Sequence, residues 1–132
     1  MILGMGTDII DIKRIESVID RYGDRFKKRI FTTKEIAKCE SRRLSVNSYA
    51  KRYAVKEACS KALGTGFRRG VYWRDIEIIN SKSGKPELYL HNGALEILNN
   101  LTPPDCNSKI DVTITDEYPY AQAIVIITYE NK

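Results

Sequence analysis

A stretch near the middle of the chain combines an acidic side chain, a basic side chain and a run of small residues. Glu57 and Lys61 are four residues apart, so on a helix they lie on the same face. As an exposed pair they form a surface salt bridge worth under about 0.5 kcal/mol. As a functional pair, Glu57 offers a metal-binding carboxylate and Lys61 a cation for phosphate, which the bare backbone of Gly64 and Gly66 could approach closely. Spacing alone favours the salt bridge.

Asp8 is a second carboxylate with two interpretations. It lies where a short apolar segment meets the first expected helix, so its charge could favour the positive end of that helix dipole. It could instead join Glu57 as a hard oxygen ligand. Magnesium is typically held by one or two carboxylates and completed by water and substrate phosphate.

Basic residues are concentrated on the first expected helix. Arg14 and Arg21 are seven residues apart and therefore nearly in line, and Arg25 follows just past Gly23. Such a stripe is either a solvated basic face or a docking surface for an acidic partner. Further cations that could receive phosphate groups are Arg42, Arg43, Lys51, Arg52, Arg68 and Arg69. The single histidine, His91, is assigned no role.

The elements that must position these residues mix helices with strand pairs. The first half predicts a strand over 2–10, a helix from Asp11 to Gly23, a shorter helix begun by the capping box of Thr32 and Glu35, and a helix over 46–63 with alanine at every fourth position. The second half predicts strands over 73–79, 87–91, 110–115 and 121–129, a short helix around 95–98, and turns at 81–86 and 118–120. This order predicts an α+β fold in which antiparallel strands pack against helices.

Bulk composition is that of one cytoplasmic globular domain spanning residues 1–132. The chain is 42% hydrophobic and 30% charged, and it has no repeat, linker or apolar run near the ~20 residues of a membrane span. The N-terminus has no basic lead-in, so we expect no signal peptide. Three widely spaced cysteines show no zinc pattern and predict reduced thiols. A net charge of +5 speeds association with an acidic partner without naming it.

Several short motifs are spread along the chain in a fixed order. They are Gly6-Thr7-Asp8-Ile9, the segment 52–66 (RYAVKEACSKALGTG), Gly84-Lys85-Pro86, and Thr113-Ile114-Thr115 before Tyr120-Ala121. In this order and spacing they resemble the holo-acyl-carrier-protein synthase family of phosphopantetheinyl transferases. The resemblance spans nearly the whole chain and reverses the preference for a plain salt bridge at Glu57.

The resemblance implies an activity and a set of partners. It implies transfer of 4′-phosphopantetheine from coenzyme A to a serine of an apo acyl carrier protein, with magnesium, in support of fatty acid biosynthesis. It also implies a compact homotrimer with active sites between subunits. By position it implies Asp8 and Glu57 as metal ligands, Lys61 as the phosphate-facing catalytic lysine, Arg52, Lys61, Gly64 and Pro86 as coenzyme A contacts, and Arg14, Arg21 and Arg25 as carrier contacts.

Two positions depart from the family pattern. Thr7 replaces a branched aliphatic residue, which is a minor change. Asp116 stands where the family commonly has histidine, and a carboxylate cannot donate to phosphate as protonated histidine can. Asp116 either acts on the magnesium shell, directly or through water, or caps the turn at 118–120 by bonding its own backbone.

Two other classes of function share some of these sequence features. A non-catalytic basic module for nucleic acid or an acidic protein would explain the charge, but Asp8 and Glu57 would repel phosphates unless a metal intervened. Broader transferases that modify carriers of peptide or polyketide synthesis are usually longer, with two such halves in one chain. The sequence therefore predicts the single-carrier enzyme, with neither nucleic acid nor membrane as a partner.

Overall fold

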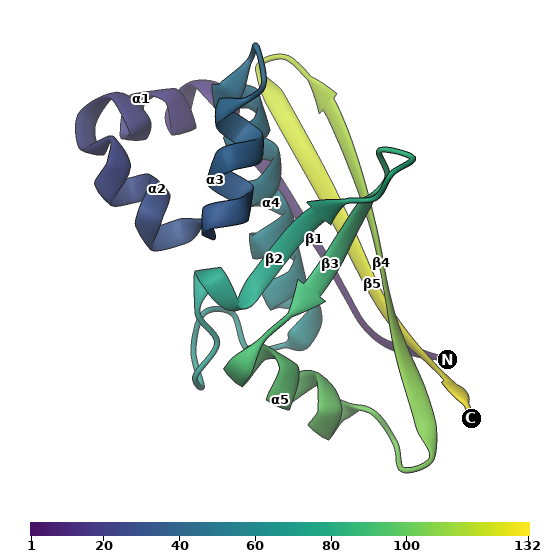
Figure 1. The fold of residues 1–132 in the computed structure, drawn as a ribbon. Helices are drawn as coiled ribbons and strands as arrows, with labels where there is room; N and C mark the ends of the chain where they lie inside the picture. Colours follow the sequence, from purple (N-terminus) through teal and green to yellow (C-terminus); the bar gives the residue numbers. More distant parts are fainter.

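The structure is a computed structural model that describes all 132 residues. Its elements in chain order are β1 (Ile2–Asp11), α1 (Ile12–Tyr22), α2 (Asp24–Ile30), α3 (Thr33–Glu40), α4 (Ser45–Leu63), the 3₁₀ turn η1 (Trp73–Asp75), β2 (Ile76–Asn80), β3 (Pro86–Leu90), α5 (Asn92–Leu101), β4 (Cys106–Glu117) and β5 (Tyr120–Asn131). Helices and antiparallel strand pairs are mixed, so the predicted α+β class is confirmed (Figure 1).

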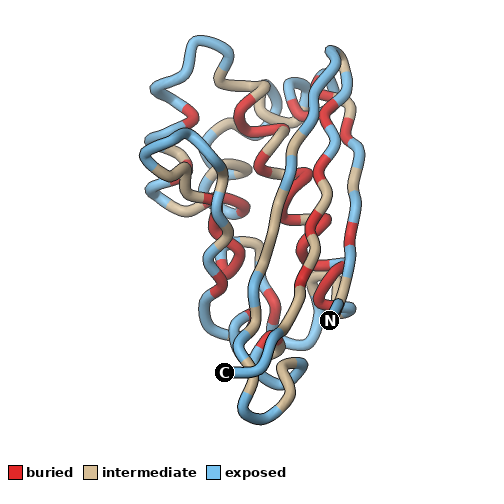
Figure 2. The backbone as a smooth tube through the Cα atoms, turned by 90° about the vertical axis from the view of Figure 1, so that its right-hand side faces the viewer, coloured by how far each residue is buried: buried red, intermediate tan, exposed pale blue.

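The strands form two separate antiparallel sheets. The larger sheet has the order β1-β5-β4, and the smaller one is the β2-β3 hairpin. The middle strand β5 alternates buried and more exposed residues, as a strand with one covered face does (Figure 2). Its buried members Ala121, Ala123, Val125 and Ile127 face α4. The long helix α4 therefore covers one face of the larger sheet.

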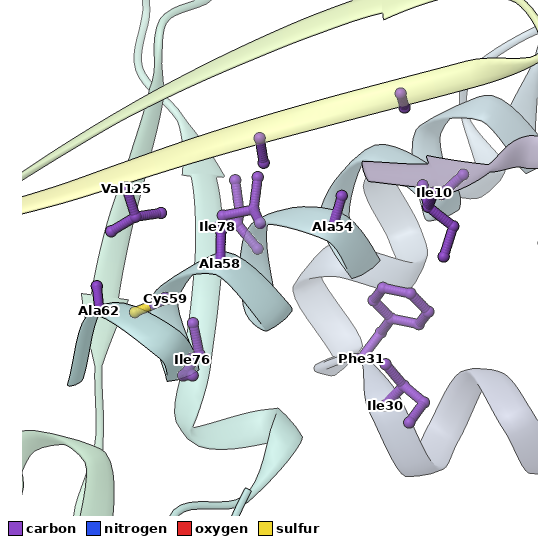
Figure 3. Packing of buried hydrophobic residues seen from close by; sticks show 14 of the residues in the cluster. Ile10, Ile30, Phe31, Ala54, Ala58, Cys59, Ala62, Ile76, Ile78 and Val125 are labelled. Carbon is purple, nitrogen blue, oxygen red and sulfur yellow. The ribbon is translucent and has the colours of Figure 1, made fainter. Parts of the chain in front are cut away.

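The hydrophobic core surrounds α4 on two sides. Ala54, Ala58 and Ala62 are 5% exposed or less, and they lie toward the larger sheet, where Val125 is completely buried (Figure 3). The other side of α4 packs against α3 and β2. The alanine spacing that predicted this helix thus reflects a flat surface on which a sheet can rest closely.

The backbones of β1 and α4 touch each other. A Cβ atom on Gly6 would lie 1.9 Å from the carbonyl oxygen of Ala58, and one on Gly4 would lie 2.0 Å from that of Ala62. Only glycine permits this approach, because any side chain would overlap the helix backbone. The contact fixes where the rest of β1, including Asp8, lies along α4.

A buried ion pair anchors the opposite side of α4. The Lys56 ammonium donates to Glu35 Oε1 at 2.8 Å and to the carbonyls of Trp73 and Ile76, and both charged side chains are fully buried. Glu35 Oε2 also accepts from the backbone N–H of Ile78 at 3.1 Å. Burial lowers the pKa of Lys56, and the Glu35 charge opposes that shift. Because every partner is satisfied, the pair fixes the rotation of α4 against α3 and β2.

The structure departs from the sequence-based prediction at two elements. Residues Trp73–Asp75 form a 3₁₀ turn rather than the start of a strand, and Asp75 accepts there from the backbone N–H of Tyr72. Helix α2 was not predicted, because its seven residues are mostly charged and show no long apolar period. The predicted capping box of Thr32 and Glu35 is confirmed. None of the helices combines the length and apolarity needed to cross a membrane.

Gly6→Ala is expected to destabilise the protein by about 3 kcal/mol or more, because the new methyl group must displace helix backbone. Urea unfolding measures this as a lower midpoint. Glu96→Ala is the control, since it places the same alanine at an exposed position of α5, away from the contact between β1 and α4. Equal stability of Gly6→Ala and the wild type would contradict the backbone contact.

Candidate active site

Lys61 and Asp8 meet where α4 lies against β1. Lys61 Nζ is 3.1 Å from Asp8 Oδ1 and 3.1 Å from the carbonyl oxygen of Thr7. The salt bridge between Glu57 and Lys61 that spacing allowed does not form, because β1 offers Lys61 a nearer carboxylate. Asp8 lies in β1 three residues before Asp11, and Asp11 is the residue that caps α1 by accepting from the backbone N–H of Lys13 at 2.9 Å.

Glu57 lies close to the same pair. Burial raises the pKa of Glu57, and the charge of Asp8 raises it further, while Lys61 and Arg14 oppose the shift. The two carboxylates are thus close enough to repel each other. The structure brings Asp8, Glu57 and Lys61 together at one site, and their roles there stay a prediction.

Tyr53 belongs to this region although it was given no role from the sequence. Burial raises the pKa of Tyr53, and the nearby charge of Glu57 adds to the shift. The ring lies 4.8 Å from Trp73 and 6.2 Å from Phe26 in stacked arrangements. Its place one turn before Glu57 on α4 was the available signal.

A separate basic cleft of about 830 Å³ opens between the first half of α4, the β2-β3 hairpin and β4. The residues that line it are Arg42, Arg43, Leu44, Asn47, Ser48, Lys51, Arg52, Ile78, Asn80, Lys85, Pro86, Val112, Thr113, Ile114 and Asp116. Cations therefore share the lining of the cleft with a few apolar side chains. Such a lining suits an anionic ligand with a flat or apolar part.

Arg52 is the most constrained cation of the cleft. Its side chain donates through Nη1 to Ser48 Oγ at 2.7 Å and through Nη2 to Asn80 Oδ1 at 2.8 Å. The residue is only 7% exposed, and its Nε has no partner. An unpaired buried donor is costly, and the bonds to Ser48 and Asn80 hold the guanidinium of Arg52 in one orientation at the wall of the cleft.

The four residues expected to contact coenzyme A do not meet within one chain. Arg52 and Pro86 line the basic cleft, whereas Lys61 and Gly64 do not. Arg52 and Lys61 are nine residues apart, about two and a half turns, so they project from opposite sides of α4. The expected contacts of one chain therefore fall into two groups, which we call half-sites: Arg52 with Pro86, and Lys61 with Gly64.

Asp116 lies in the basic cleft, with Lys51 as its partner. Its Oδ2 is 3.2 Å from Lys51 Nζ. The carboxylate makes no hydrogen bond to the turn that follows, so the turn-cap interpretation is wrong. No group of three or more acidic, histidine or cysteine side chains could hold a metal in this chain, so Asp116 does not complete the Asp8–Glu57 pair within it.

The three arginines expected to contact a carrier are exposed on α1 and α2. None of Arg14, Arg21 and Arg25 forms an ion pair, whereas nearby Lys27 pairs with Glu40 at 3.2 Å. The guanidinium of Arg21 lies 5.3 Å from the centre of the Tyr22 ring. The stripe therefore leaves three cations open to an outside partner.

Comparisons with known proteins identify the family to which this chain is similar. The family model of the 4′-phosphopantetheinyl transferase superfamily matches residues 4–121. A holo-[acyl-carrier-protein] synthase of Parvibaculum lavamentivorans is 56% identical over 128 residues, covering 97% of this chain and 96% of that protein. The crystal structure of the Neisseria meningitidis holo-[acyl-carrier-protein] synthase superposes with a TM-score of 0.86 at 34% identity, over 97% of this chain and 99% of that one.

A third similar protein carries a ligand. The crystal structure of a Bacillus anthracis holo-(acyl-carrier-protein) synthase in complex with CoA (3′,5′-ADP) has a TM-score of 0.77 at 32% identity and covers 96% of each chain. Sequence motifs, fold and full-length similarity thus converge, and this chain belongs to the 4′-phosphopantetheinyl transferase superfamily.

Proposed function

We propose that this chain is a cytoplasmic holo-acyl-carrier-protein synthase that transfers 4′-phosphopantetheine from coenzyme A to a serine of apo acyl carrier protein, in support of fatty acid biosynthesis. The serine oxygen attacks the pantetheine-bearing phosphorus, the bond from that phosphorus to the leaving phosphate breaks, and adenosine 3′,5′-bisphosphate departs. The observation that carries the proposal is the meeting of Asp8, Glu57 and Lys61 at the β1–α4 contact. Phosphoryl transfer needs positioning and charge stabilisation above all.

The residues present at this site fit magnesium. Asp8 and Glu57 offer hard oxygen donors, and their mutual repulsion would be relieved by a cation. Magnesium, when bound, supplies a Lewis acid and a counter-charge for the pyrophosphate of coenzyme A. Asp8 also orients Lys61. As an ammonium, Lys61 would face the leaving phosphate, whereas only its neutral amine could take the serine proton.

We propose a homotrimer in which each active site joins the half-sites of two subunits. Arg52 and Pro86 would hold the nucleotide of coenzyme A for the Asp8, Glu57 and Lys61 of a neighbour. The outer face of the larger sheet supports this arrangement, because Met5 and Ile9 of β1 are 60% and 63% exposed. An apolar sheet face left open in one chain is typical of a surface that another copy covers.

The unpaired arginine stripe is proposed as the carrier contact. Arg14 lies near enough to Glu57 to lower its pKa, so a carrier on this stripe would present its serine beside the metal ligands. Arg21 and Arg25 extend the positive surface away from the site. Opposite charge speeds the encounter and sets the orientation of the partner.

Retaining Glu57 costs stability at neutral pH. The pKa of Glu57 in the folded protein is raised above 4.5, so the folded state favours the protonated side chain. The protonated form therefore stabilises the protein below about pH 4.5, and this stability is lost as pH rises through the folded pKa. Glu57→Gln keeps the neutral form at every pH. Without magnesium, it is expected to raise the melting temperature at pH 7, with the gain fading below pH 4.5.

Thermal unfolding across pH checks this expectation. Glu16→Gln is the control, because Glu16 is an exposed carboxylate of α1 and its replacement changes the net charge equally. A Glu57→Gln variant that melts lower than the wild type at pH 7 would contradict the assigned environment.

Intact mass of an apo acyl carrier protein tests the function itself. After incubation with the enzyme, coenzyme A and magnesium, the carrier is expected to gain one phosphopantetheine group. Asp8→Asn should abolish the gain while leaving the fold intact, because Asp8 is a strand residue outside the hydrophobic core. A non-catalytic binding module would leave the carrier mass unchanged, and full activity of Asp8→Asn would overturn the proposed site.

A further inference from the structure

The basic cleft contains a single carboxylate. Its cations are Arg42, Arg43, Lys51, Arg52 and Lys85, and its only acidic side chain is that of Asp116. Five like charges around one cavity repel one another in the absence of a ligand. Asp116 therefore acts as the only acidic counter-ion built into the cleft.

Strand register turns Asp116 inward. It lies opposite Ala121, whose side chain is buried beneath α4, so Asp116 points to the same side of the larger sheet. Its neighbour Glu117 points to the other side. The ion pair with Lys51 thus joins two walls of the cleft, α4 and β4.

The cleft holds one fixed cation and one that can change partner. Arg52 is held by Ser48 and Asn80, so its guanidinium is already in place for a ligand. Lys51 and Asp116 have side chains 34% and 42% exposed, so their pair is weak and either group can turn to water or to a ligand. A bound phosphate would compete with Asp116 for Lys51.

We propose that Asp116 competes with the phosphate of the nucleotide for binding to Lys51. Lys51 leaves Asp116 for the phosphate when the nucleotide enters and returns when the nucleotide product departs. Asp116 thereby weakens the hold of the cleft on adenosine 3′,5′-bisphosphate and lets the product leave more readily. This inference rests on the proposed placement of the nucleotide in the cleft.

Calorimetric titration with adenosine 3′,5′-bisphosphate, in EDTA to exclude metal, tests the proposal. Asp116→Asn is expected to bind the nucleotide about two- to fivefold more tightly, the range that half-exposed ion pairs reach. Glu117→Gln is the matched control: it makes the same charge change on the next residue of β4 and is expected to change the affinity little. Equal tightening by both variants would show a general charge effect and overturn the exchange.

A double-mutant cycle separates exchange from simple repulsion. In a Lys51→Met background, Asp116→Asn should raise the logarithm of the nucleotide affinity by less than half as much as it does in the wild-type protein. The reason is that no lysine remains for Asp116 to hold back. The same gain in both backgrounds, or weaker binding by Asp116→Asn, would overturn the proposal.

Arg52→Met tests separately whether the nucleotide binds in the basic cleft. If this variant leaves nucleotide affinity unchanged, the nucleotide does not bind in this cleft and the proposed function loses its coenzyme A half-site.

Discussion

The structure depends on a backbone contact between β1 and α4. Gly4 and Gly6 let the strand touch the carbonyl oxygens of Ala62 and Ala58, where any side chain would overlap the helix. That contact places Asp8 against Lys61 and beside Glu57. The arrangement of the site therefore depends on having glycine at both positions. A β1 strand lifted by one methyl group would separate the carboxylates and leave Lys61 unpaired. The position of the candidate metal ligands is therefore a packing property of the core.

The second requirement is that α4 cannot rotate. The buried Lys56–Glu35 pair ties its far side to α3 and β2. With rotation fixed, one helix presents Arg52 into the basic cleft and Lys61 to the opposite side. Each half-site also contains polar groups in an unfavourable state. At one, the carboxylates of Asp8 and Glu57 repel each other, and at the other, the Nε–H of Arg52 has no hydrogen-bond partner. Such groups are typical of a site that awaits charged ligands.

Local patterns predicted much of this fold, and long-range contacts explain what they missed. Alanine at every fourth position predicted α4, and the Thr32–Glu35 capping box predicted the start of α3, because both are local rules. The resemblance implied Asp8 and Glu57 as joint metal ligands, and the structure places Asp8 against Lys61 of α4. Spacing proposed Glu57 as the partner of Lys61, whereas the structure supplies Asp8 from a strand 53 residues away. The pairing of Asp116 with Lys51 likewise joins strand and helix across the chain, so neither interpretation drawn from its own neighbourhood could find it.

In the proposed trimer, each active site joins the two sides of α4 from neighbouring subunits. Co-expression of Glu57→Gln with Arg52→Met tests it directly, because each variant spoils a different half-site. Measured by carrier modification, the mixture is predicted to recover about a quarter of the wild-type rate, since random assembly places two intact halves at about one interface in four. A mixture no more active than the average of the two variants would show that the halves act within one chain and would contradict the account.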